Sequence, residues 1–211
     1  MASVHPSTHP LILSNISALR DARTPPAEFR RLVRVTAMLL AYEAMADLET
    51  REVEVETPLA TAKCRVPAAS VALVPVLRAG LGMADGVLDV VPDAQVWHIG
   101  LRRDEKTLRP EQYYTRLPTR CGVGLVLLLD PMLATGGSAV HACHLLKAAG
   151  VTRLKYLSIL AAPEGIEALS AAMPDVAIHV AAIDEKLNEV GFIHPGLGDA
   201  GDRQFNTLHQ D

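Results

Sequence analysis

Residues 124–150 read GLVLLLDPMLATGGSAVHACHLLKAAG, and this stretch predicts a buried strand, a tight turn and a helix in succession. The opening apolar run is short and continuous, as in a strand covered on both faces, and it ends at Asp130. Gly136 and Gly137 mark the turn, and a helix is expected over residues 137–149. Because a parallel sheet binds ligands beyond the carboxyl ends of its strands, this turn is the first candidate site in the chain.

Further apolar runs repeat the strand pattern along the chain. They begin at residues 71, 95, 153 and 176 and read VALVPVL, QVWHIGL, RLKYLSIL and VAIHVAAI. Residues 81–90 and 164–172, which lie between such runs, suit helices. This alternation predicts an α/β fold in which helices flank a mainly parallel, twisted sheet. With 211 residues and no evident linker, we expect a single domain over residues 1–211.

The N-terminal part adds a helix and a strand to this scheme. A helix is predicted from about Pro25 to Asp47, with Thr24 as its cap. A stripe of basic side chains lies mostly off its apolar face, at Arg30, Arg31 and Arg34. Such a stripe is usually solvated, although it could bind a nucleotide effector or a partner subunit. Residues 51–57 alternate Glu with Val and predict an antiparallel or edge strand.

Composition and charge exclude several classes of protein. Hydrophobic residues make up 49% and charged residues 21%, which is typical of a globular domain rather than a disordered or fibrous chain. The net charge of −4 and the 4% of aromatic residues predict no nucleic-acid partner and no anionic membrane surface. Three widely spaced cysteines, no secretory signal and no apolar run near the ~20 residues that span a bilayer predict a cytoplasmic location.

The turn after residue 130 has the chemistry of an anion site. Its backbone N–H groups and the positive end of the following helix dipole suit a phosphate, and the hydroxyls of Thr135 and Ser138 add donors. Asp130 could accept hydrogen bonds from sugar hydroxyls. A plain turn with a Ser/Thr helix cap is the alternative, because short motifs are often fortuitous. The stretch is neither a GK[ST] phosphate loop nor a GxGxxG motif.

Two other segments could carry function. Residues 102–120 are polar, contain two prolines and are too long for an ordinary connection, so we expect a mobile functional loop or a small hairpin. His141, Cys143 and His144 share one predicted helix. Cys143 and His144 cannot face one partner together, so we expect a solvated or partly buried helix face and assign no residue as a metal ligand.

The string LLLDPMLATGGS at residues 127–138 resembles the phosphoribosyl-pyrophosphate (PRPP) loop of type I phosphoribosyltransferases. Pro131 replaces the second acid of that loop, which is similar to the uracil phosphoribosyltransferase family in particular. Collinear strings extend the resemblance over nearly the whole chain; they are LLAYEA (39–44), VPVLRAGLGMADGVL (74–88), RDE-TL (103–108), AAPEGI (161–166), ID-x-x-LNE (183–189) and PGLGDAGDR (195–203). Departures from the family pattern are Arg102, Phe192 and Asn206, where an aromatic residue, Tyr and Gly are common.

The resemblance implies transfer of a phosphoribosyl group from PRPP to uracil, giving UMP and pyrophosphate, with Mg²⁺ as cofactor. For this reaction we expect catalytic roles for Arg103, Asp130 and Asp199. The implied PRPP contacts are Arg78, Arg103, Asp130, Pro131, Met132, Leu133, Ala134, Thr135, Gly136, Gly137, Ser138 and Asp199. The implied uracil contacts are Ile193, Gly198, Asp199 and Ala200.

The resemblance also implies how the remaining segments act. The insertion at about 102–120 would be a flexible lid loop or hairpin over PRPP, and the tail at about 191–211, expected as ordered loop, would bind the base. A homo-oligomer is expected, and GTP could be an effector. Two alternatives stay open. One is a phosphoribosyltransferase for another base, and the other is a catalytically weak regulator that binds nucleotides.

Overall fold

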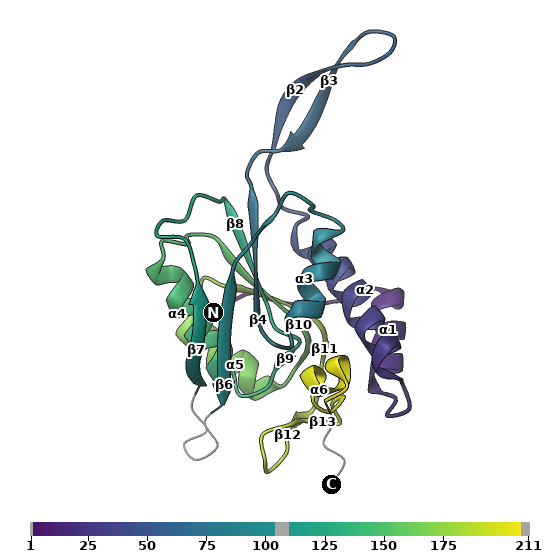
Figure 1. The fold of residues 1–211 in the computed structure, drawn as a ribbon, viewed down its shortest axis with the longest axis vertical. Coiled ribbons are helices and arrows are strands. Elements are labelled where there is room, and N and C mark those ends of the chain that lie inside the picture. The colour runs from purple at the N-terminus through teal and green to yellow at the C-terminus, as the bar shows by residue number, and fades with distance from the viewer. Residues whose placement is uncertain (1, 104–109, 208–211) are drawn as a thin grey trace.

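A central sheet organises the computed structural model, which describes residues 2–103 and 110–207 (Figure 1). The strand order is β1 (Val4–Pro6), β11 (Ala177–Ile183), β10 (Leu154–Ala161), β8 (Leu125–Leu129), β4 (Val71–Leu77), β6 (His98–Arg103) and β7 (Pro110–Arg116). Two short strands join it, β5 (Gln95–Val96) beside β4 and β9 (Met132–Leu133) beside β10. Every pair is parallel except β6 with β7. The predicted parallel sheet is therefore confirmed.

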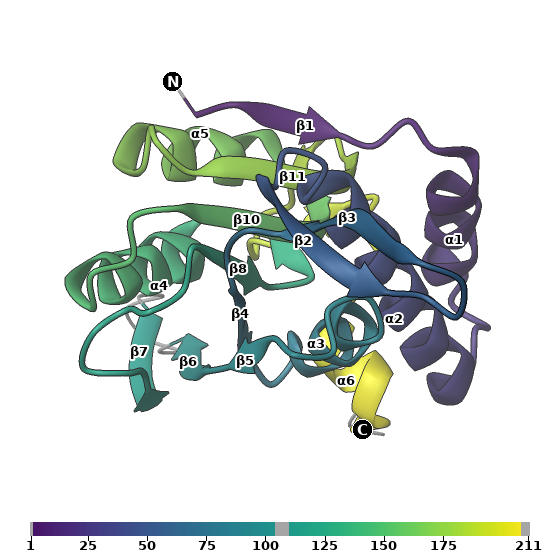
Figure 2. The same cartoon turned by 90° about the horizontal axis from the view of Figure 1, so that it is seen from above.

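Helices cover both faces of the sheet, as Figures 1 and 2 show. One layer contains α1 (Pro10–Arg20), α2 (Pro26–Ala44) and α3 (Leu81–Leu88), and the other contains α4 (Gly137–Ala148) and α5 (Pro163–Ala172). Alternate residues of each central strand belong to opposite cores: Leu127 packs with the α1–α3 layer and Leu128 with the α4–α5 layer. This double burial explains why the strands appear as unbroken apolar runs.

The strand expected at residues 51–57 is β2 (Thr50–Glu56), which pairs antiparallel with β3 (Thr61–Pro67). The two strands form a hairpin of their own that projects from one end of the domain (Figure 1). Neither strand contains a fully buried residue, because the hairpin packs on no second layer within the described chain. The antiparallel prediction is confirmed, whereas β3 was not predicted.

The N-terminal elements differ in part from the sequence expectation. The helix predicted from Pro25 is α2, but Thr24 does not cap it: the Thr24 hydroxyl donates to the Ala18 carbonyl at 2.6 Å. Helix α1 was not predicted, although His9 and Pro10 form a start signal and Ile12, Ile16 and Leu19 share its buried face.

The tail is more regular than expected. It contains β13 (Ile193–His194), which pairs with β12 (Lys186–Leu187) just before the tail, and α6 (Ala200–Phe205), so the prediction of ordered loop over 191–211 was wrong for α6. Asp199 caps this helix by accepting from the Asp202 N–H at 2.8 Å, and Asn206 ends it in the left-handed conformation at φ 55°. Residues 208–211 lie outside the described chain.

Part of the 102–120 insertion is now defined. Strands β6 and β7 pair antiparallel, with Arg103 opposite Pro110, so the described part of the insertion is a hairpin. Residues 104–109 lie outside the described chain. Within the parts of the chain that are described, no helix is both long and apolar enough to cross a bilayer.

Candidate functional site

A cavity of about 270 Å³ lies at the carboxyl ends of the central strands and joins the two segments that the sequence singled out. Its first wall is the loop after β8, and its second wall is the segment from β13 to α6. The predicted site residues that line it are Asp130, Met132, Leu133, Ala134, Thr135, Gly136, Ser138, Ile193, Gly198, Asp199 and Ala200. The structure thus brings together residues more than sixty positions apart in the chain.

The first wall depends on glycine at the start of α4. Gly136 is the N-cap residue and adopts φ +80°, where a side chain would be strained. A Cβ there would also lie 2.9 Å from Ala168 Cβ and 3.0 Å from the Gly165 carbonyl oxygen. The Ser/Thr cap that we considered is absent at this position, because glycine has no side chain to engage the first N–H groups of α4. Gly137, the second glycine of the predicted turn, is the first residue of the helix.

Pro131 anchors this wall without lining the cavity. Its carbonyl accepts from the Ile159 N–H at 3.1 Å and the Leu160 N–H at 3.0 Å. These two bonds join the loop to β10, and Pro131 is buried there. A second carboxylate at this position would have to be desolvated, which is costly without a partner.

Asp130 has an unusual protonation equilibrium. Burial raises the pKa of its carboxyl to about 7, and a backbone hydrogen bond from the Met132 N–H at 3.4 Å offsets this only in part. Near neutral pH the side chain therefore exchanges between an acceptor-only carboxylate and a carboxylic acid that can donate. Hydrogen-bond donors that enter the cavity would favour the carboxylate.

Tyr156 also lines the cavity and was not among the predicted site residues. It is fully buried, and its hydroxyl has no hydrogen-bond partner among the described residues. The pKa of its phenol is well above 10, first because of burial and then because of the Asp130 charge. The nearby Ser158 hydroxyl lowers the pKa of Tyr156, but it donates its own proton to the Leu160 carbonyl at 2.9 Å. Tyr156 stands in the apolar run RLKYLSIL, so its sequence context indicated only core.

The second wall is an irregular backbone with two left-handed glycines. Gly196 and Gly198 adopt φ +64° and +79°, and the His194–Pro195 peptide bond is cis. A Cβ on Gly196 would lie 2.1 Å from the Ile193 carbonyl oxygen. This turn places Gly198 and Asp199 at the cavity, where their main-chain groups are available to a ligand.

Arg78 and Arg103 lie outside the lining of the cavity. Arg78 follows β4 through a cis Leu77–Arg78 bond, and its half-exposed guanidinium donates to Asp202 Oδ1 at 3.1 Å. It therefore lies beside α6, while its neighbour Ala79 lines the cavity. The backbone of Arg103 ends β6, and its side chain lies outside what the structure describes.

The remaining candidates, the cysteine of α4 and the arginine stripe of α2, lie away from the cavity. Cys143 is buried in α4, which raises the pKa of its thiol to about 12, and the described residues contain no cluster of three His, Cys, Asp or Glu side chains that could hold a metal. In the arginine stripe, Arg31 pairs with Glu28, Arg34 pairs with Asp89, and Arg30 donates to the Gln204 carbonyl.

A family model described as uracil phosphoribosyltransferase matches residues 6–207 of this chain. The chain belongs to the uracil phosphoribosyltransferase family. Asn206, which departs from the family glycine, is explained by its left-handed conformation, because Asn tolerates that region better than other residues with side chains. Phe192, the second departure in the tail, is half-exposed and lines the cavity.

Uracil phosphoribosyltransferases of several bacteria are similar to this chain over their whole length. That of Clostridium beijerinckii is 53% identical over 208 residues, which cover 98% of this chain and 100% of the relative. That of Roseiflexus sp. (strain RS-1) is 55% identical over 207 residues, again 98% and 100% of the two chains.

Solved structures agree with the family on the fold. The AQ2163 protein from Aquifex aeolicus is similar with a TM-score of 0.92 at 37% identity, and the match covers 96% of this chain and 97% of that one. A hypoxanthine-guanine phosphoribosyltransferase from Bacillus anthracis has a TM-score of 0.50 at 12% identity, over 75% and 80% of the two chains, which shows the fold alone. The predicted type I phosphoribosyltransferase fold is confirmed.

Proposed function

We propose that this protein transfers the phosphoribosyl group of PRPP to uracil, giving UMP and pyrophosphate. The observation that carries the proposal is the single cavity whose two walls are a phosphate-type loop and an irregular backbone turn. A transferase needs both sites side by side, because its two substrates must meet with their reacting atoms in contact. Membership of the uracil phosphoribosyltransferase family supports the choice of substrates.

The first wall would hold PRPP. The backbone N–H groups at the start of α4, with the hydroxyls of Thr135 and Ser138, would bind the 5′-phosphate at the positive end of the helix dipole. Asp130 would accept hydrogen bonds from the ribose hydroxyls. Arg78 and Arg103 would stabilise the charge that develops on the departing pyrophosphate, with the 102–120 segment acting as a lid.

The second wall would read uracil through its backbone. Uracil presents two carbonyl acceptors and an N–H donor, which main-chain groups near Ile193 and between Gly198 and Ala200 can match. Asp199 is our candidate for receiving the proton from uracil N1. One of its carboxylate oxygens accepts from the Asp202 N–H, which fixes the orientation of the side chain.

Mg²⁺ is the cofactor that this reaction class implies. Magnesium prefers oxygen ligands and usually combines one or two carboxylates with substrate phosphates and water. Asp130 and Asp199 both line the cavity, so the available donors fit such a site, whereas an all-protein cage is absent from the described residues. When bound, the ion would supply positive charge beside the pyrophosphate.

Release of pyrophosphate from PRPP, measured on addition of uracil and in parallel with other pyrimidine and purine bases, tests the proposal. We expect turnover with uracil and little with the other bases. Faster turnover with another base would establish the first alternative, and PRPP or nucleotide binding without turnover would establish the regulator. Repeating the assay with GTP tests the effector. The homo-oligomeric state and the cytoplasmic location stay predictions.

A further inference from the structure

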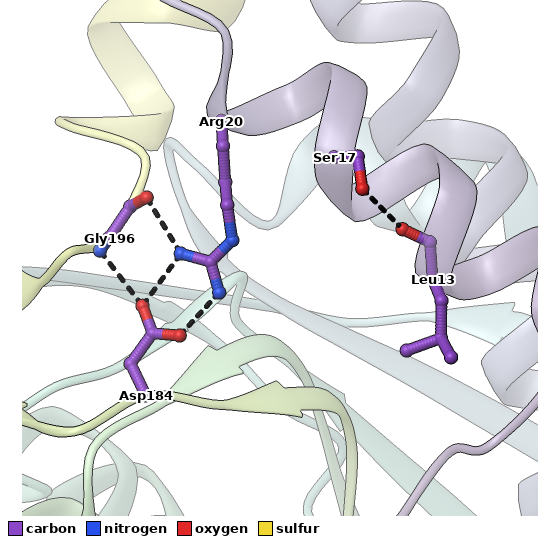
Figure 3. Close-up of polar contacts among 5 residues, drawn as sticks. All are labelled: Leu13, Ser17, Arg20, Asp184 and Gly196. Atoms are coloured by element: carbon purple, nitrogen blue, oxygen red, sulfur yellow. Dashed lines mark hydrogen bonds and ion pairs between the residues drawn. The ribbon is translucent and has the colours of Figure 1, made fainter.

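Arg20, in the last turn of α1, lies against the turn that forms the second wall of the cavity (Figure 3). Its Nη1 atom donates to Asp184 Oδ2 at 2.8 Å and to the Gly196 carbonyl at 2.9 Å, and its Nη2 atom donates to Asp184 Oδ1. The Gly196 N–H donates in turn to Asp184 Oδ2 at 2.8 Å. Both backbone polar groups of Gly196 are therefore held by one ion pair.

This ion pair is protected from solvent on its acidic side. The Asp184 side chain is 3% exposed. Burial alone would raise the pKa of Asp184, but the hydrogen bonds from Arg20 and the Gly196 N–H outweigh it and lower the pKa. The carboxylate therefore stays charged at neutral pH. Bidentate pairing of this kind also fixes geometry, because the planar guanidinium matches both carboxylate oxygens.

A second arginine ties the neighbouring residue of the same turn to the same end of α1. Arg203, from α6, donates through Nη1 to the Leu197 carbonyl at 2.8 Å and to the Leu19 carbonyl, and through Nη2 to the Asp21 carbonyl at 2.6 Å. Its guanidinium carbon lies 4.3 Å from the centroid of the Phe29 ring. Two cationic side chains thus connect Gly196 and Leu197 to residues 19–21.

We propose that Arg20, Asp184 and Arg203 are positioning residues for the base substrate. The inference rests on the proposed function, in which uracil is read by main-chain groups. Main-chain groups cannot change rotamer to fit a ligand. The position of the groups that bind uracil therefore depends on how firmly the turn is held. Gly196 and Gly198 have the most conformational freedom of any residue type, and ordering them during binding would weaken affinity. The side chains of Arg20, Asp184 and Arg203, which we call the clamp, hold Gly196 and Leu197, directly before Gly198, in place before a base binds.

The same contacts could merely stabilise the fold, and the separate kinetic constants distinguish the two roles. Asp184→Asn keeps an oxygen for the Gly196 N–H but removes the charge that orients Arg20. We expect KM for uracil to rise roughly tenfold, because small displacements of binding groups weaken binding strongly. KM for PRPP should change less than about twofold, since the hydrogen bonds that the described residues form with the clamp include none from the first wall. The preference for uracil over cytosine should also fall.

Arg23→Ala is the matched control. Arg23 pairs with Asp21 just after α1 and its side chain is 91% exposed, so this variant removes an ion pair at the same end of the helix without a contact to the turn. Both KM values should stay at the wild-type level. Arg203→Met is the second test. It removes the hydrogen bonds that Arg203 donates to the carbonyls of Leu19, Asp21 and Leu197. This variant should also raise KM for uracil selectively.

The proposal is overturned if folded Asp184→Asn or Arg203→Met melts at a lower temperature while KM for uracil is unchanged, or if both KM values rise together. Should Asp184→Asn fail to fold, Arg203→Met decides alone. If the wild type uses another base, the proposed function fails, but the KM of that base then replaces the KM of uracil in the same comparison. The two failures are therefore separable.

Discussion

The two walls of the cavity are built in opposite ways. The first wall, called the phosphate wall below, is local: residues 130–138 follow one buried strand, and the sheet and α4 hold them directly. The second wall, from β13 to α6, is called the base wall. The base wall has little regular structure of its own, and it depends on residues as distant as Arg20 and Asp184. A rigid strand end can present N–H groups without help, whereas a glycine-rich turn needs partners from elsewhere in the fold. The local wall should therefore tolerate remote substitutions, and the base wall should not.

Base choice is expected to give the largest effect. Cytosine replaces the O4 acceptor of uracil with an amino donor and removes the N3 hydrogen, so two main-chain groups of the base wall would lose their partners. Each unpaired buried group costs roughly 1–3 kcal/mol, which predicts a preference for uracil of about two to four orders of magnitude. The measurement is kcat/KM for both bases.

Variants of the base wall test whether backbone groups are the readers. Ile193→Val keeps the main chain and should keep the preference. Gly198→Val should damage uracil use, because its φ of +79° strains any β-branched residue, although a Cβ would meet only Arg203 Cδ at 3.6 Å. Comparable use of cytosine by the wild type, or loss of preference in Ile193→Val, contradicts main-chain readout.

Gly136→Val should disable the phosphate wall while the base wall stays intact. The side chain would adopt φ +80° and collide with Ala168 and the Gly165 carbonyl, so the loop must move. Displacement of about 1 Å can cost roughly a hundredfold in rate, which we expect in kcat/KM for PRPP.

Gly150→Ala is the control for Gly136→Val. Gly150 is also left-handed, at φ +86°, but it follows the other end of α4, and a Cβ there would meet nothing within 4 Å. This variant should lose roughly 1 kcal/mol of stability and bind PRPP normally. Normal PRPP affinity in folded Gly136→Val, measured by calorimetry, would remove the anion site from this loop.

Two carboxylates should respond to pH with opposite signs. Burial raises the pKa of Asp130 to about 7, so its ionised form destabilises the fold, and its contribution to stability is lost as pH rises through about 7. Asp184 has a lowered pKa, so its contribution is present at neutral pH and is lost as pH falls below the ordinary value near 3.8. Asp130→Asn should therefore raise the unfolding free energy at pH 8 by on the order of 2 kcal/mol, whereas Asp184→Asn should lower it.

Chemical denaturation of both variants at pH 5.5 and pH 8 measures this difference. The gain from Asp130→Asn should shrink at pH 5.5, where the wild-type carboxyl is already protonated. In the wild type, kcat/KM for PRPP should also fall as pH drops below about 7, because the ribose hydroxyls need the carboxylate as acceptor. An Asp130→Asn protein that is less stable than the wild type at pH 8 would show that the carboxyl has a partner in solution.

Tyr156→Phe should give the smallest effect. The hydroxyl lacks a partner among the described residues, and Tyr156 lines the cavity from β10, so a ligand can supply the missing hydrogen bond. Removing it should cost about 1 kcal/mol in kcat/KM for PRPP, roughly fivefold, without lowering the melting temperature. Tyr42→Phe, at an exposed side chain of α2, is the control. An unchanged rate together with a lower melting temperature would make Tyr156 an ordinary core residue.

The sequence by itself determined the sheet and the phosphate wall. Strands such as β8 are buried on both faces and must be apolar throughout, so the pattern is visible without knowledge of any partner. The loop at 130–138 could be predicted because its chemistry is contained in consecutive residues. The family resemblance then supplied the candidate base residues, which the same cavity brings beside the loop.

Only the tertiary structure decided what holds the base wall. Arg20 and Asp184 are 164 positions apart, and Arg78 and Asp202 are 124 apart, so no local pattern could pair them. Tyr156 appeared to be core because a buried strand residue and a cavity-lining residue have the same sequence context. Helix α6 was hidden because a six-residue helix has too few turns to show a period. The local pattern of apolar residues shows which side chains are buried. Ion pairs between residues far apart in the chain, in contrast, depend on how the helices and the sheet pack together.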